Sequence, residues 1–164
     1  TYVADYRRNG NLDTLVAIMH YNGEILGKDE IRSILEVRWG LEKMAVARAI
    51  DFASDAELEA LGVHVTALGV LPAAAQAAEL AFSFHHDMTI AGGNTILPLI
   101  YSSFKAPCTV LWIRFCRKYG VAALYANVER LYRHILNRDK ENAEKWVDDY
   151  LSEAVEGSQQ IYQG

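Results

Sequence analysis

A histidine on the apolar face of a predicted helix is the first residue of this chain suited to a functional site. His85 lies on a stripe of apolar residues spaced three or four apart, which contains Leu80, Phe84, Met88 and Ala91. Glycines 92 and 93 are expected to end this helix through a left-handed turn, and Asn94 to cap the next. An inward imidazole is either a hydrogen-bonded core residue or a contact for a ligand, and both interpretations stay open here.

Arg38 is the second such residue, because Leu35 and Leu41 on either side of it predict an inward position. A guanidinium keeps its charge at any ordinary pH and cannot be buried without an anion. The anion is either a protein carboxylate, such as Glu42 or Glu79, or the acid group of a bound ligand.

A metal centre is not expected around His85. His85, His86 and Asp87 are consecutive, so at about 100° per residue they point in different directions and do not share one ion. The inward positions expected to face His85 on other helices are Val128 and Tyr150, and neither is a good ligand. We therefore predict no metal and no other cofactor.

An enzymatic alternative remains. The His86-Asp87 pair resembles the paired ligand of HD-type phosphohydrolases, which are all-helical and metal-dependent. That hypothesis needs His20 upstream and either Asp139 or Asp148 downstream. The chain has no Ser/His/Asp signature, glycine-rich phosphate loop or CxxC pair.

The elements that must position these residues are all helical. Helical spacing predicts helices over 12–21, 28–52, 54–68, 72–91 and 94–119, and two more near the C-terminus, around 124–135 and 143–154. We expect Pro72 in the first turn of its helix and Pro107 to kink the helix over 94–119. The predicted inward residues of that helix are Ile96, Ile100, Phe104, Cys108, Leu111 and Phe115. The fold class is all-α, an antiparallel bundle of six to seven helices.

Composition limits the class of protein and the cellular compartment that we expect. With 164 residues, 51% of them hydrophobic and 23% charged, the chain has the make-up of one ordinary globular domain. A net charge of -5 gives no general attraction to nucleic acid. Cys108 and Cys116 are separated by about 12 Å of helix rise, too far for a disulfide. Free thiols, no signal peptide and no apolar run of roughly 18 residues predict a cytoplasmic protein without a membrane partner.

Four motifs carry a resemblance to a known family. The stretch 1–5 (TYVAD) resembles the last wing strand of a winged helix-turn-helix domain. Residues 35–42 (LEVRWGLE) resemble an "LxxR..LE" opening, and residues 84–94 resemble an "FHxxI..ASGN" signature. Asp139 and Ala143 match the "D...A" spacing of a closing helix pair. In this order the motifs resemble the C-terminal effector-binding domain of bacterial GntR-type transcription regulators of the FadR subfamily.

The resemblance implies a non-enzymatic regulator whose operator affinity changes when a small molecule enters the bundle. Residues 1–10 would be the remnant of a wing strand and a linker to a missing N-terminal domain. Residues 11–164 would form the helical effector-binding and dimerisation domain. The implied partners are an acidic or acyl effector, a second copy in a homodimer, and DNA only through the missing domain.

The family's metal ligands, one Asp and three His, fall at Ala81, His85, Val128 and Tyr150, so only His85 is retained. The stretch around Leu111 and Trp112 is closer to the metal-free branch that responds to fatty acyl-CoA. Arg38 matches a ligand-proximal arginine of the family. The predicted ligand-binding residues, in a cavity where the effector pairs with Arg38, are Arg38, Phe84, His85, Trp146 and Tyr150.

Overall fold

Ten helices and no strand make up residues 6–23 and 26–156, the part of the chain that this computed structural model describes. They are α1 (Tyr6–Asn9), α2 (Leu12–Tyr21), α3 (Lys28–Phe52), α4 (Asp55–Ala60), α5 (Gly62–Gly69), α6 (Ala74–Ala91), α7 (Leu97–Ser103), α8 (Lys105–Tyr119), α9 (Val121–Leu136) and α10 (Lys140–Val155). The predicted all-α bundle is confirmed. The expected wing strand at 1–5 lies outside the described residues, so the division at residue 10 stays a prediction.

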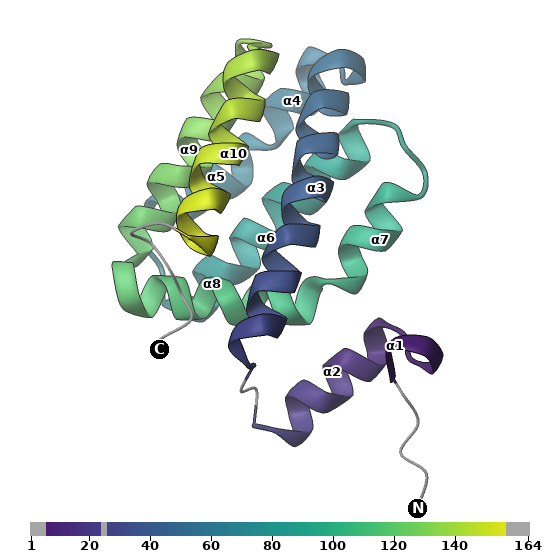
Figure 1. The fold of residues 1–164 in the computed structure, drawn as a ribbon. Helices are drawn as coiled ribbons and strands as arrows, with labels where there is room; N and C mark the ends of the chain where they lie inside the picture. The colour runs from purple at the N-terminus through teal and green to yellow at the C-terminus, as the bar shows by residue number, and fades with distance from the viewer. Residues whose placement is uncertain (1–5, 24–25, 157–164) are drawn as a thin grey trace, which may run out of the picture.

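The bundle is built around α3 and α6, which pack against each other. Helix α10 runs along α3, α9 lies beside α10, and α8 packs against α6 (Figure 1). Helices α1 and α2 lie to one side of this bundle, below α7 in the same view. In the described residues, no helix is long and apolar enough to cross a membrane.

Helix starts follow the capping residues of the sequence. Ser54 accepts a hydrogen bond from the backbone amide of Glu57, whose carboxylate accepts one back from the amide of Ser54, completing the predicted capping box. The segment that follows is two helices rather than one, because the axis changes at Leu61 between α4 and α5. The described helices therefore outnumber the six or seven expected.

The predicted helix over 94–119 is wrong in one respect: it is broken at Phe104 into α7 and α8. Pro107 consequently lies in the first turn of α8, where a missing amide is tolerated, and it kinks no helix interior. The break also changes which side of α7 is buried. Ile96 and Ile100 are exposed, while Leu97 and Tyr101 are in the core.

The junction between α6 and α7 depends on two glycines that have different roles. Gly93 has a φ of 72°, the left-handed conformation expected for a helix exit. Gly92 is right-handed, but a Cβ added to it would lie 2.9 Å from Cβ of Arg48. Gly92 thus allows α6 to approach α3 closely. One smaller expectation fails: α6 begins at Ala74, so Pro72 precedes its cap.

Candidate functional site

A buried ion pair on α3 is the centre of the site. Arg38 Nε donates to Glu42 Oε1 at 2.6 Å, and both side chains are buried, Glu42 completely. The two residues are one helical turn apart, so they share a face of α3. The two alternatives for the anion beside Arg38 were a protein carboxylate and the acid group of a ligand. The structure shows a protein carboxylate, that of Glu42, whereas Glu79 pairs with Lys105.

Two tyrosines from other helices complete the hydrogen bonding of Glu42. Tyr101 Oη on α7 donates to Glu42 Oε1 at 3.2 Å, and Tyr150 Oη on α10 donates to Oε2. Burial by itself favours the neutral acid, but Arg38, His85 and the hydrogen bond from Tyr150 together lower the pKa of Glu42. Burial and the nearby carboxylate raise the pKa of both tyrosines, so these stay neutral donors.

His85 on α6 lies beside this pair and is also buried. Its Nδ1 is 3.6 Å from Glu42 Oε1 and has no hydrogen-bond partner among the described residues. Its ring stacks on Trp112 with 5.5 Å between centroids and 9° between planes. Burial lowers the pKa of His85 to about 4, although Glu42 opposes this shift, so the imidazole is neutral near pH 7.

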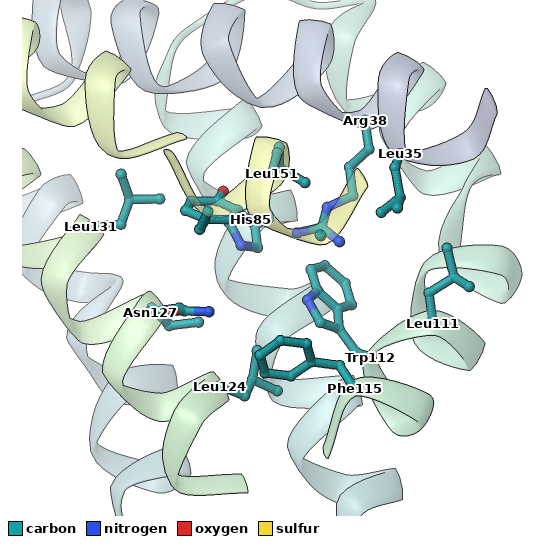
Figure 2. A pocket seen from close by; sticks show the side chains of 13 residues that line it. Leu35, Arg38, His85, Leu111, Trp112, Phe115, Leu124, Asn127, Leu131 and Leu151 are labelled. Atoms are coloured by element: carbon teal, nitrogen blue, oxygen red, sulfur yellow. The ribbon is translucent and has the colours of Figure 1, made fainter. Parts of the chain in front are cut away.

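A pocket opens beside Arg38 and His85 (Figure 2). Its cavity volume is about 30 Å³. Its walls come from α3, α6, α8, α9 and α10, and the lining residues are Leu35, Arg38, His85, Leu111, Trp112, Phe115, Leu124, Asn127, Val128, Leu131, Tyr150, Leu151 and Ala154. The site is therefore an apolar chamber with a small polar end.

Figure 2 shows how the polar end is arranged. Arg38 reaches from α3 toward Trp112 on α8, and its guanidinium carbon lies 4.3 Å from the centroid of the indole. Asn127 approaches from α9 on the opposite side of the chamber. The guanidinium, the imidazole and the Asn127 amide are the polar groups that a guest could contact, together with the hydroxyl of Tyr150.

The five predicted site residues separate into two groups. Arg38, His85 and Tyr150 line the same pocket. Phe84 and Trp146 lie outside the lining. Phe84 is fully buried and packs edge-on against His85, with 5.2 Å between the ring centroids. Trp146 packs against Tyr150 with 5.9 Å between the ring centroids. Each therefore contacts a lining residue without lining the pocket itself.

Sequence reasoning missed three contributors to the site. Trp112 lies on the stripe formed by Cys108 and Phe115, a spacing that would have identified it as inward. Tyr101 was missed because a continuous helix through Phe104 gives the wrong phase for α7. Nothing in the sequence distinguishes Asn127 from other polar residues of α9.

The residues at the family's metal positions do not fit a metal. Ala81 and Val128 have no ligating atom, and the Tyr150 hydroxyl donates to Glu42. The described residues contain no group of three or more His, Cys, Asp or Glu side chains that could hold an ion.

The residues proposed for a phosphohydrolase site do not come together either. His86 Nε2 lies 3.2 Å from the carbonyl oxygen of Pro98, and Asp87 pairs with His64 at 2.6 Å. Asp148 accepts from Trp39 and Lys43, and Asp139 caps α10.

These features define an all-helical bundle with a partly open, mostly apolar chamber between its helices. The model of the FCD domain matches residues 33–153, which is most of the chain. The match contains α6, α8 and α9 in full and most of α3 and α10, the other two helices of the chamber walls. The protein belongs to this family, the C-terminal effector-binding domain of FadR-like regulators of the GntR family. No curated protein and no solved structure matches the chain significantly.

Proposed function

We propose that this chain is the ligand-sensing and dimerisation domain of a bacterial GntR/FadR-type transcription regulator, and that it has no catalytic role. Its effector is a small organic acid or acyl compound that enters the chamber between α3, α8, α9 and α10. The observation that carries the proposal is the chamber itself, in which a buried guanidinium and a neutral imidazole face apolar walls. DNA is contacted through a winged helix-turn-helix domain N-terminal to this one, in the cytoplasm.

The effector acts by shifting the population of helix arrangements. The chamber volume of about 30 Å³ is well below the roughly 150 Å³ of a cavity that binds benzene, so an organic guest requires its walls to separate. A guest held against Arg38 therefore binds the more open arrangement preferentially, and differential affinity of this kind is what moves a conformational equilibrium. The five helices that form the walls would carry the change to the dimer interface and to the DNA-binding domain.

Thermal-shift screening against small organic acids and acyl compounds tests this proposal. A guest at 100 times its Kd is expected to stabilise the protein by about 2.7 kcal/mol. Ala154→Phe fills the chamber from α10, and we expect it to abolish the shift. Ala126→Phe is the matched control, because Ala126 is an exposed residue of α9, and it should leave the shift unchanged.

Two results would contradict the proposal. One is a shift that Ala154→Phe leaves intact, since the guest would then bind elsewhere. The other is the absence of any shift with the whole panel, which would leave a dimerisation module without a ligand.

A further inference from the structure

The charges around the chamber bear on what kind of guest it accepts. Arg38 is the one cation in its lining, and Glu42 already compensates it at 2.6 Å. The other titratable groups that face this pair are His85 on α6, Tyr101 on α7, Cys108 on α8 and Tyr150 on α10. Burial lowers the pKa of His85 to about 4 and raises the pKa of Cys108 to about 12, so neither adds charge near pH 7. The buried site is therefore electrically neutral before a guest enters.

An anionic guest would upset this balance. A carboxylate in the chamber would have to share Arg38 with Glu42, which is fully buried and has no route to water. Two buried carboxylates and one guanidinium leave an uncompensated negative charge, which is strongly unfavourable in an apolar environment. The walls offer no second cation, because nine of the thirteen lining residues are Leu, Val, Ala, Phe or Trp and the remaining four are Arg38, His85, Asn127 and Tyr150.

The hydrogen-bonding capacity at the polar end favours an uncharged acceptor instead. A guanidinium has five N–H donors, of which the one on Nε donates to Glu42, and the group also hydrogen-bonds with Tyr150. The remaining edge of the group is directed at the chamber, over the face of Trp112 (Figure 2). A carbonyl oxygen accepts from such donors without bringing a charge, while a hydrocarbon body fits against the leucines of α8, α9 and α10.

Resting on the proposed function, we propose that the effector is an uncharged acyl compound, an amide, ester or thioester, and not a free acid. Its carbonyl oxygen accepts from Arg38, and its hydrocarbon body occupies the apolar part of the chamber. Glu42 is the specificity-determining residue, because it cancels the charge that would otherwise attract a carboxylate.

Isothermal titration calorimetry near neutral pH with matched pairs of guests tests this. The probes are butanamide, hexanamide and octanamide, each compared with the carboxylate of the same length. For the length that binds best, we expect the wild-type protein to bind the amide at least about tenfold more tightly than the carboxylate.

Two variants identify Glu42 as the cause. Glu42→Gln leaves Arg38 uncompensated, so the order should reverse and the carboxylate should bind more tightly than the amide. The double variant Arg38→Met/Glu42→Gln is neutral again and should keep the wild-type order, with weaker amide binding because the donor is gone. Should Glu42→Gln fail to fold, the wild-type and double-variant comparisons still decide the matter.

The possible failures are distinguishable. A wild-type protein that prefers the carboxylate, or a folded Glu42→Gln variant that keeps the wild-type order, would overturn this inference while leaving the chamber as an effector site. Absence of binding by every probe to every protein, together with a negative thermal-shift screen, would overturn the proposed function as well.

Discussion

Arg38 has two roles, because it forms a buried ion pair with Glu42 and also lines the chamber. Its guanidinium is buried and paired, which is the usual arrangement for a charge inside a protein. The same group forms part of the chamber wall and stacks over Trp112. A substitution of Arg38 alone therefore mixes an effect on stability with any effect on binding, and a double variant is needed to separate the two.

Removal of Arg38 alone should be more damaging than removal of both charges. Arg38→Met leaves the Glu42 carboxylate buried with two tyrosine donors and no cation, and we expect a loss of about 3–5 kcal/mol in the free energy of unfolding. Adding Glu42→Gln should restore about half of that loss or more. Urea unfolding of the wild-type protein, both single variants and the double variant gives the coupling energy, and strictly additive losses would show that the pair is not a unit.

His85 should make the protein sensitive to mild acid. The pKa of His85 is lowered by burial from 6.5 to about 4, so between these values the unfolded chain binds a proton that the folded protein does not. Stability is therefore complete above the unfolded pKa and falls as the pH drops toward 4. The expected loss from about pH 7 to about pH 5 is about 2 kcal/mol.

His85→Phe removes the titrating group but keeps an aromatic ring beside Trp112. Urea unfolding of this variant should show a pH dependence that is flatter by about the same 2 kcal/mol over that interval. Equal slopes for the wild-type protein and the variant would mean that another group causes the acid sensitivity.

At the scale of the elements, the contact between α3 and α6 sets the geometry of the site, since α3 carries Arg38 and Glu42 and α6 carries His85. Gly92 brings the end of α6 against the backbone of α3, where an added Cβ would lie 2.9 Å from Cβ of Arg48 and 3.2 Å from the amide nitrogen of Ala49. The α7–α8 break has a comparable role, because it turns Tyr101 inward to reach Glu42.

Two Gly→Ala substitutions provide a matched test of the α3–α6 contact. Gly92→Ala should force the helices apart and lower the free energy of unfolding by about 1–3 kcal/mol. Gly40→Ala, in the middle of α3, meets nothing within 4 Å and should instead stabilise the protein by up to about 1 kcal/mol. Chemical unfolding measures both, and a neutral Gly92→Ala would show that the close approach is easily relieved.

At the scale of the whole molecule, the chamber is formed by five helices, the consecutive α8, α9 and α10 together with α3 and α6 from earlier in the chain. Its lining begins at Leu35 and ends at Ala154, so no lining residue belongs to α1 or α2. Figure 1 shows these two helices beside the bundle and not within it. The effector site should accordingly be independent of the N-terminal segment.

A protein that begins at residue 26 should therefore bind the same guest with a Kd within about threefold of the full chain. Its thermal stability should be lower, because the shortened protein lacks the buried side chain of Met19 and therefore exposes the apolar surface that Met19 covers. Calorimetric titration with the best guest from the screen measures the Kd. A loss of binding by a folded protein of this kind would place α1 or α2 in the effector site.

Helical periodicity in the sequence was enough to predict which residues face inward along most of the helices. Arg38, His85 and Tyr150 were identified in this way, because a helical period of 3.6 residues is a local property that the chain alone reveals. The capping residues located several helix starts for the same reason. The sequence also indicated the family, through motifs within those helices.

Which of the inward residues contact one another depends on how the helices pack in the tertiary structure. Helical periodicity gives the buried side of each helix but not the height at which two helices cross, so it could not show that Tyr101 and Tyr150 both reach Glu42. Nor could it place Phe84 behind the chamber and Trp112 in its wall. The break at Phe104 resets the phase of α7, and such a break depends on packing around the segment more than on its own residues.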